Sequence, residues 1–268
     1  MKKLILIYDF DKTLSPKYMQ EYGFFAKLNT NNDDFMARQA KFCKKNNCDM
    51  ILSFLLLALK EAKANNIKLT HKFMQNCGKN IEYYNGVEHW FERINKFGKD
   101  NGVEVEHYII SCGNKEILEG SSIYKNFKEV FASEYLFDEN KEAYWPKVLV
   151  NYTTKTQCLY KIRKQIFNDN FDEVTINKKF KPEDVLPFEN MVYLGDGETD
   201  VPCMKIVKMN GGMSLSLYAE KGSSKEEFAQ SLYNDERVDY AVKADYSENT
   251  EIDILIKNRI LEIAKKKD

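Results

Sequence analysis

Residues 4–13 read LILIYDFDKT, an apolar run that ends at a cluster of acidic and hydroxyl side chains. A short, continuously apolar run is typical of a strand that is buried on both faces of a parallel sheet. Two later stretches repeat this arrangement: residues 103–110 lead into Ser111-Cys112-Gly113, and residues 191–194 lead into Gly195-Asp196-Gly197. Because ligands of an open parallel sheet bind beyond the carboxyl ends of its strands, we expect the three strand ends to meet at one crevice.

Helical patterns separate these strands, as a parallel α/β sheet requires. Apolar residues recur at helical spacing in four segments, at 86–99, 154–167, 201–209 and 251–265. Later in the chain, strand patterns occur at 213–218 and 241–244, and residues 131–152 have the pattern of a β-hairpin. The predicted fold class is therefore α/β, with a Rossmann-like parallel sheet.

The segment 16–85 lacks strand signals and contains helical patterns at 18–28, 33–46, 49–65 and 70–81. Asp49 and Thr70 stand where helix N-caps are expected. We expect residues 16–85 to form a helical cap domain over the crevice, and residues 1–15 with 86–268 to form the core domain. The candidate cap contacts to a substrate are Tyr18, Tyr22, Phe24, Phe25 and Arg38.

Composition narrows the classes of function. Lys and Arg number 40 and Asp and Glu 41 among 268 residues, which leaves a net charge of -1. A nucleic-acid-binding protein usually carries a basic excess, so no nucleic-acid partner is expected. The apolar stretch at 50–59 is too short to span a bilayer, and the N-terminal run breaks at Asp9 with no cleavage signal after it. We expect a cytoplasmic monomer or homodimer with no membrane partner.

The six cysteines contain no C-x-x-C pair, and the three histidines show no metal-ligand spacing. Free thiols in a reducing compartment are therefore expected, in place of disulfides or a zinc site. Cys112 has no histidine close to it in the sequence, which argues against a nucleophilic thiol at that position.

Asp9 and Asp11 place two carboxylates close together where the first strand ends. Phosphoryl transfer to an acid needs a nucleophile, a nearby proton donor and a cation that offsets phosphate charge. Two neighbouring carboxylates supply the first two functions, because their repulsion raises the pKa of one of them. Aspartate clusters also form turns and helix caps, so this pair has a purely structural alternative.

Asp196 and Asp200 belong to the stretch GDGETD at 195–200, in which the glycines permit a tight turn after the strand. Asp196 is expected to point into the crevice as an oxygen ligand for Mg²⁺. Asp200 precedes Val201-Pro202 at a predicted helix start. It has two roles open to it, a place around the metal or a helix N-cap.

Ser111 and the backbone N–H groups that follow it, at Cys112 and Gly113, are candidates for an anion cradle. Lys155 falls in the first turn of a predicted helix, where a positive charge opposes the helix dipole. A functional partner is therefore expected for it, namely the nucleophile and the transferring phosphoryl group. Lys147 and Lys161 are the alternative lysines for this role.

Taken together, these motifs resemble those of phosphatases in the haloacid dehalogenase (HAD) superfamily. The stretch DFDKT resembles the family's DxDxT signature, and GDGETD resembles its GDGxxD signature, while Ser111 and Lys155 resemble the two motifs between them. The motifs occur in the family order and span residues 9–200. The helical segment after the first strand is similar to a cap of the C1 type, as in phosphoserine phosphatase-like members.

The resemblance implies a role for each motif residue. Asp9 would be the nucleophile and Asp11 the general acid and base. Mg²⁺ would be held by Asp9, the Asp11 carbonyl oxygen and Asp196, with Asp200 nearby. Ser111 and Lys155 would bind the phosphoryl group, and Cys112, Gly113 and Thr13 belong to the expected substrate-binding set.

The resemblance also separates branches of the family. Haloacid dehalogenases proper lack the second aspartate, which is present here as Asp11, and the family's transport ATPases need membrane helices. The stretch IISCGNKE at 109–116 departs from the glycine-rich version of phosphoserine phosphatases, which argues against serine phosphate as the substrate. The expected activity is hydrolysis of a small phosphorylated metabolite. The alternatives are a phosphomutase or phosphotransferase, and a non-catalytic phospho-ligand-binding protein.

Overall fold

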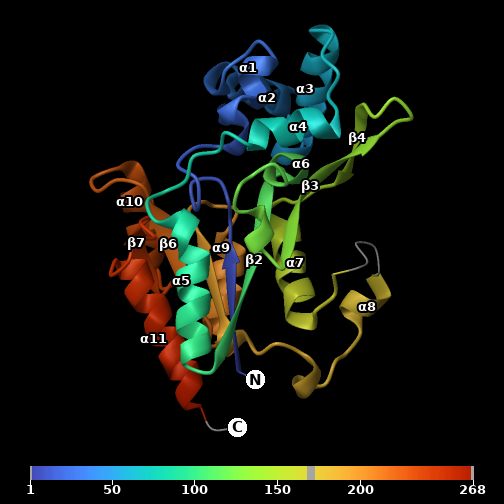
Figure 1. Cartoon of the computed structure of the whole chain (residues 1–268). Coiled ribbons are helices and arrows are strands. Elements are labelled where there is room, and N and C mark those ends of the chain that lie inside the picture. The colour runs from blue at the N-terminus through green and yellow to red at the C-terminus, as the bar shows by residue number, and fades with distance from the viewer. Residues whose placement is uncertain (1, 168–172, 267–268) are drawn as a thin grey trace.

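The computed structural model describes residues 2–167 and 173–266, and its centre is a seven-stranded sheet (Figure 1). The strands follow the order β4-β3-β2-β1-β5-β6-β7, and neighbouring strands are parallel except for β3 and β4. Their bounds are β1 Lys2–Tyr8, β2 Val103–Asn114, β3 Glu129–Phe137, β4 Ala143–Val148, β5 Met191–Gly195, β6 Met213–Tyr218 and β7 Tyr240–Lys243. The predicted α/β class and its mostly parallel sheet are confirmed.

β1 is the central strand, and it is buried on both faces as its apolar run predicts. Leu4, Leu6 and Tyr8 belong to one hydrophobic core, whereas Ile5 and Ile7 belong to another. This division follows from the two-residue period of a strand, which sends alternate side chains to opposite faces. The sheet therefore separates two helical layers.

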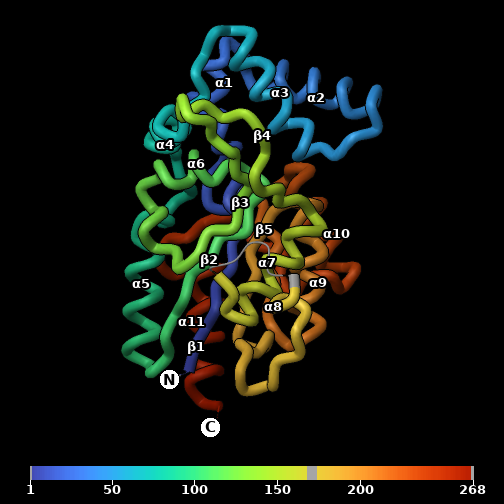
Figure 2. The backbone as a smooth tube through the Cα atoms, turned by 90° about the vertical axis from the view of Figure 1, so that its right-hand side faces the viewer, coloured from blue at the N-terminus to red at the C-terminus, as the bar shows by residue number. Residues whose placement is uncertain are grey.

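The two layers consist of helices from different parts of the chain. The first core includes residues of α5 (Val87–Asp100) and α11 (Glu251–Lys265). The second includes residues of α7 (Tyr152–Lys164), α9 (Val201–Met209) and α10 (Ser224–Asn234). Figure 2 shows α5 on one side of the strands and α7 and α9 on the other.

The predicted helix boundaries agree closely with the structure at α9 and α11 and less well at α7. We expected α7 to cover 154–167, but it begins at Tyr152 and ends at Lys164. The Asn151 side chain caps the N-terminus by accepting bonds from the backbone N–H groups of the second and third helical residues. Gln165 adopts a left-handed conformation with φ 56°, which ends the helix early.

The segment 16–85 folds into helices that lie beyond the carboxyl end of β1 (Figure 1). Asp49 and Thr70 cap α3 and α4 with their side chains, as predicted. The expected continuous helix at 18–28 is wrong, because Gly23 with φ 129° splits it into a 3-10 turn and α1. The predicted end of the last helix at residue 81 is also wrong, because α4 stops at Gly78. The helices are η1 Met19–Tyr22, α1 Phe24–Lys27, α2 Asn32–Asn46, α3 Met50–Ala64 and α4 His71–Gly78.

The predicted hairpin is formed by β3 and β4, and it ties the helical segment to the sheet. Its β4 end donates a backbone hydrogen bond from Ala143 N to Leu69 O at 2.8 Å. The Tyr135 hydroxyl of β3 donates to Leu55 O at 2.9 Å. The helical segment is therefore attached to the sheet in two places, by these hydrogen bonds to the β3–β4 hairpin and by the loop after β1.

The remaining helices are short: α6 Lys115–Leu118, α8 Glu173–Asn177, η2 Tyr124–Asn126, η3 Pro182–Asp184 and η4 Phe188–Asn190. The first and last described elements, β1 and α11, bring both termini to the end of the sheet opposite the helical segment (Figure 1). Among the described residues, no helix combines the length and apolarity that a bilayer crossing requires. All six cysteines are free thiols.

Candidate active site

Three neighbouring strands end at the same edge of the sheet, in the order β2-β1-β5. Asp9 directly follows β1, Ser111 lies in the last part of β2, and Asp196 directly follows β5. The backbone N–H of Asp9 bonds to Leu194 O at 2.9 Å, which fixes the end of β1 against β5. The convergence expected from the three apolar runs is therefore present.

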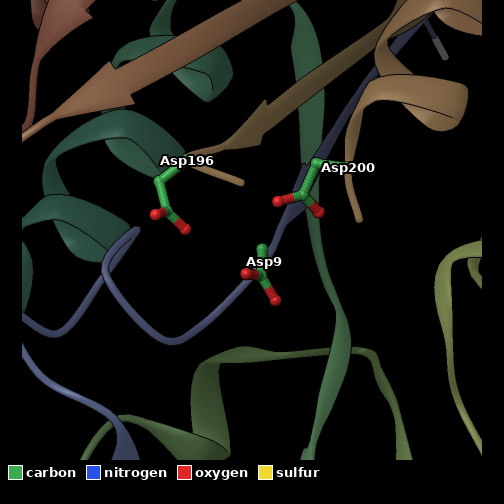
Figure 3. Close-up of side chains that lie close together, drawn as sticks. All are labelled: Asp9, Asp196 and Asp200. Carbon is green, nitrogen blue, oxygen red and sulfur yellow. The ribbon is translucent and has the colours of Figure 1, made fainter. Parts of the chain in front are cut away.

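Three aspartates from two of these strand ends meet at one point. One carboxylate oxygen each from Asp9, Asp196 and Asp200 lies within 4.8 Å of the others, and all three residues are buried. Figure 3 shows the three side chains close together. Oxygen atoms at this spacing have the chemistry and the geometry to share a hard divalent cation.

Asp11 does not belong to this cluster through its carboxylate. Its Oδ1 accepts a hydrogen bond from the Met19 backbone N–H at 2.7 Å, which turns the side chain toward the start of the helical segment. Burial, the largest influence, raises the pKa of the Asp11 carboxyl to about 7. The two aspartates of the first motif therefore occupy different environments.

Lys155 places a buried positive charge in the site. Its side chain is fully buried, and its Nζ lies 3.0 Å from Asp9 Oδ1 and 2.6 Å from Asp200 Oδ1. The alternative lysines lie elsewhere, since Lys147 pairs with Glu134 and Lys161 lines a cavity at the β3–β4 hairpin. The unfavourable position of Lys155 near the N-terminus of α7 is thus compensated by two carboxylates.

Asp200 stands at the N-cap position of α9, but its side chain makes no capping bond. Its Oδ1 also accepts from the Tyr193 hydroxyl at 2.8 Å, and its Oδ2 accepts from Gly197 N at 3.2 Å. Of the two roles considered from the sequence, the helix cap is therefore excluded for the side chain. The carboxylate is instead fixed among the other groups of the site.

Gly195 makes room for Asp200. A Cβ at residue 195 would lie 2.5 Å from Asp200 Cγ and 2.7 Å from its Oδ2, closer than non-bonded atoms approach. At Gly197 the nearest atoms would be 3.8 Å and 3.9 Å away, so a side chain fits there. The first glycine of the GDGETD stretch is therefore required by packing against Asp200.

Charge in the site is unbalanced toward the negative. Burial, followed by the charge of Asp200, raises the pKa of Asp9 well above its ordinary range. Burial also raises the pKa of Asp196, and Lys225 opposes that rise. For Lys155, burial opposes ionisation, but Asp200 and Asp9 outweigh it and raise the pKa of the ammonium. These carboxylates favour a further positive charge beside them.

A cavity of about 250 Å³ opens from this cluster toward the helical segment. Asp9, Asp11 and Asp196 line it together with three further residues that the sequence indicated, Ser111, Cys112 and Gly113. The lining residues from the segment 16–85 are Tyr18, Gln20, Met36, Gln39, Met50, Ile51 and Phe54. The cavity is therefore bounded by the strand ends on one side and by α2 and α3 on the other.

Ser111, Cys112 and Gly113 of β2 offer fewer free hydrogen-bond donors than the expected anion cradle requires. Gly113 N already donates to Ser111 Oγ at 3.0 Å, so this N–H is occupied within the chain. Burial raises the pKa of the Cys112 thiol to about 12, which keeps it protonated. Ser111, a buried residue that lines the cavity, retains a hydroxyl hydrogen to donate.

Thr13 does not line the cavity. Its side chain is fully buried, and its hydroxyl has no hydrogen-bond partner among the residues that the structure describes. Of the five candidate contacts on the helical segment, only Tyr18 reaches the cavity. Phe24 and Phe25 instead pack in the core with Phe35 and Phe54, as aromatic residues at helical spacing commonly do.

Lys225 is a site residue that the sequence analysis missed. It lies at the start of α10, and its Nζ is 3.1 Å from Asp196 Oδ2. Two signals point to it: Ser223 and Glu226 have capping-box spacing, and Lys225 stands in a first helical turn. The argument that singled out Lys155 therefore applies to Lys225 as well.

Comparison with known proteins gives the same architecture. A HAD family hydrolase from Salmonella enterica serovar Typhi has a TM-score of 0.58 and 15% identity, with 94% of this chain and 69% of that chain covered. A phosphoserine phosphatase with a phospho-aspartyl intermediate analogue has a TM-score of 0.55 and 13% identity, with 96% and 99% covered. This chain has the haloacid dehalogenase fold.

At the level of sequence the similarity is weaker. An uncharacterized protein of Borreliella burgdorferi is 24% identical over an alignment 285 residues long, which covers 93% of each chain. No protein-family model matches the chain. The haloacid dehalogenase fold is therefore established by the structure, and the chemistry has to be argued from the residues of the site.

Proposed function

We propose that the protein is a magnesium-dependent phosphatase that hydrolyses a small phosphomonoester through an aspartyl-phosphate on Asp9. One observation carries the proposal: Asp9 lies at the end of the central strand, 3.0 Å from the buried Lys155 ammonium and within 4.8 Å of Asp196 and Asp200. A carboxylate that faces a cation and a cation-binding cluster in one cavity is arranged to attack a phosphorus atom. The shared fold with a phosphoserine phosphatase supports the same reading.

The donor set fits Mg²⁺. Asp9, Asp196 and Asp200 bring three carboxylates to the cluster, against the ammonium groups of Lys155 and Lys225 that pair with them. The charge that remains is negative and favours a bound cation, and oxygen donors are the ligands that Mg²⁺ prefers. Asp9 and Asp196 would hold it, with the Asp11 carbonyl oxygen and with Asp200 beside them. When bound, Mg²⁺ offsets charge on the phosphoryl oxygens.

In the first step an Asp9 oxygen attacks phosphorus, and the bond from phosphorus to the leaving oxygen breaks. Asp11 gives its proton to that oxygen. Its pKa of about 7 leaves a substantial protonated fraction at neutral pH, and the bond from Met19 N to Oδ1 leaves Oδ2 to carry the proton. Lys155 and the Ser111 hydroxyl stabilise the negative charge of the transferring group.

In the second step Asp11, now a carboxylate, takes a proton from water while the water oxygen attacks phosphorus. The acyl-phosphate bond breaks, inorganic phosphate leaves and Asp9 is restored. Within this proposal residues 16–85 act as the cap domain, and residues 1–15 with 86–268 act as the core. Cavity-lining residues of α2 and α3 then exclude bulk water and contact the leaving group.

The test is Asp9→Asn assayed with Mg²⁺ and a generic ester such as p-nitrophenyl phosphate. We expect kcat to fall by at least about 10³-fold, because the amide of Asn cannot form the acyl phosphate. Asp100→Asn, at the exposed end of α5, is the matched control and should keep full activity. Circular dichroism should show both variants folded.

The outcomes separate the candidate functions. Turnover of a folded Asp9→Asn variant at the wild-type rate would end the nucleophile assignment. Isomerisation of a sugar phosphate without release of phosphate would identify a phosphomutase. Binding of phosphate esters by the wild-type protein without turnover of any ester, in the presence of Mg²⁺, would identify a phospho-ligand-binding protein.

A further inference from the structure

We infer that the cavity selects a phosphate ester whose leaving group is small, uncharged and mostly apolar, with one hydrogen-bond donor that meets Gln39. This inference rests on the proposed phosphatase function and adds the substrate class. It follows from the side chains that the helical segment places opposite the carboxylate cluster.

The part of the wall that α2 and α3 place opposite the carboxylates is apolar except for Gln39. Met36 of α2 and Met50, Ile51 and Phe54 of α3 line it. None of the described lining residues that come from 16–85 carries a formal charge. A carboxylate or ammonium group of a substrate would lose its hydration against this wall without gaining a partner. An apolar leaving group would instead remove its own surface from water.

Gln39 gives this wall one polar requirement. Gln39 is only 3% exposed, and its Nε2 donates to Met50 O at 2.5 Å. Its Oε1 is buried and has no partner among the residues that the structure describes. A buried acceptor without a donor is costly, and a hydroxyl or N–H of a ligand would satisfy it. Gln39 is therefore the candidate specificity residue of the cavity.

The charged residues of the lining lie at the strand ends, in the loops that follow them and at the start of α10, and they do not favour an anionic leaving group. Lys225 is paired with Asp196, and Lys12 lies over the Tyr18 ring, with Nζ 4.0 Å from the ring centroid. Glu198 also lines the cavity and would repel a second anionic group of a substrate. The phosphate end of a substrate is therefore the part that these residues favour.

The size of the cavity sets a further limit. Its volume of about 250 Å³ lies below the range of roughly 300–1,000 Å³ that is usual for pockets of drug-sized ligands. After the phosphate group is placed beside Asp9, room remains for a small organic group. A nucleotide or a long acyl chain would exceed it.

The first experiment compares matched esters on the full-length wild-type protein with Mg²⁺. Phenyl phosphate is the uncharged probe, and 4-carboxyphenyl phosphate and O-phosphoserine are the charged probes. We expect kcat/KM to be at least about tenfold higher for phenyl phosphate, because the charged groups have no partner on the apolar wall. Calorimetric binding of the same esters to Asp9→Asn should give the same order of affinity without turnover.

The second experiment moves the charge preference with one side chain. Ile51→Arg places a guanidinium on the half-buried lining position and should raise kcat/KM for 4-carboxyphenyl phosphate relative to phenyl phosphate by about tenfold. Leu52→Arg is the matched control, because Leu52 is exposed, lies on the same helix and does not line the cavity. Its preference should remain that of the wild type.

The third experiment addresses Gln39 with the three isomeric hydroxyphenyl phosphates. At least one isomer should exceed phenyl phosphate by about tenfold in kcat/KM, and in Gln39→Met the ratio of kcat/KM between that isomer and phenyl phosphate should fall to about one. Calorimetry repeats the comparison without turnover, by measuring how the esters bind to Asp9→Asn with and without Gln39→Met. An equal response to all four esters in the wild-type protein would overturn the role of Gln39.

The outcomes for the charge preference stay distinct from those for the activity. Faster turnover or tighter binding of the charged esters overturns the substrate class while leaving the phosphatase proposal intact. Turnover of none of the esters contradicts the phosphatase proposal, and the order of binding to Asp9→Asn still decides the chemistry of the cavity. An Ile51→Arg variant that behaves like Leu52→Arg overturns the assignment of α3 to the leaving-group side.

Discussion

Lys155→Met removes an ammonium that is fully buried between two carboxylates and keeps a side chain of similar length. The Nζ of Lys155 lies 2.6 Å from Asp200 Oδ1 and 3.0 Å from Asp9 Oδ1, and the residue has no exposed surface. Removing one partner of a buried ion pair leaves an uncompensated charge, which destabilises a protein by about 3–5 kcal/mol. Two carboxylates depend on this lysine, so we expect a loss of at least about 3 kcal/mol.

The assay is urea unfolding followed by circular dichroism at pH 8 with a chelator present, so that the charges of the chain alone are compared. Lys147→Met is the matched control, because Lys147 pairs with Glu134 at 2.6 Å with its side chain 41% exposed. A surface pair of this kind contributes about 0–1 kcal/mol. The difference between the two variants isolates the effect of burial.

A double variant, Lys155→Met with Asp200→Asn, keeps the test decisive where the single variant fails to fold. The oxygen of the neutral amide can still accept from Gly197 N, and its NH₂ group can donate to the Tyr193 hydroxyl oxygen, so we expect about half of the lost stability to return. A Lys155→Met variant within about 1 kcal/mol of the wild type would refute the buried-charge reasoning. So would a double variant that is less stable than the single one.

Three further predictions follow from single contacts. Gly195→Ala should lower kcat at least about tenfold, because the new Cβ would lie 2.5 Å from Asp200 Cγ. Gly197→Ala is the control and should keep activity near that of the wild type. Equal losses of activity in the two variants would contradict the packing argument. Asp196→Asn should abolish the heat of Mg²⁺ binding that calorimetry measures in the presence of phosphate, whereas Glu198→Gln should keep it. Mg²⁺ binding retained by Asp196→Asn would exclude Asp196 as a ligand. Burial raises the pKa of the Glu116 carboxyl from 4.5 to about 7, so the free energy of unfolding falls by about 3 kcal/mol as pH rises from about 4.5 through 7. In urea unfolding, the stability of Glu116→Gln relative to the wild type should therefore rise by about 3 kcal/mol between about pH 4.5 and 8. A difference between the two proteins that does not change with pH would contradict this prediction.

The core of the fold was predictable because local patterns agree there with the tertiary structure. The apolar run of β1 is buried on both faces, and the ranges predicted for α9 and α11 are those of the structure. In such segments the hydrophobic period, the caps and the strand ends all indicate the same element. The order of the strands in the sheet was not predictable, because it depends on contacts between distant parts of the chain.

Within the site, the sequence indicated the aspartates and Lys155 and missed how they are arranged. A motif does not reveal that Asp200 accepts bonds from Tyr193 and Lys155 in place of capping its own helix. Lys225 was missed because it lies outside the four motifs, although it stands in a first helical turn as Lys155 does. Thr13 was expected at the cavity from its place in the motif, yet the turn after β1 buries its side chain.

The side of the cavity that the helical segment 16–85 forms was the least predictable part. Phe24 and Phe25 stand close to the motif in sequence, but within the helical segment the Phe24 ring packs against Phe73 and the Phe25 ring packs against Phe35 and Phe54. The residues that do line the cavity, such as Met36 and Ile51, carry no chemical signature that distinguishes them from core residues. Which face of an amphipathic helix meets a cavity is decided by the packing of whole helices.

The most direct test of the account is to find the phosphoryl group on Asp9. In an Asp11→Asn variant with p-nitrophenyl phosphate and Mg²⁺, the good leaving group needs no proton, while hydrolysis of the acyl phosphate loses its base. Rapid quenching and borohydride reduction convert a phosphorylated aspartate to homoserine, which peptide mass spectrometry locates. We predict homoserine at residue 9; homoserine at another aspartate, or release of nitrophenol with Asp9 unmodified throughout the reaction, would contradict the account.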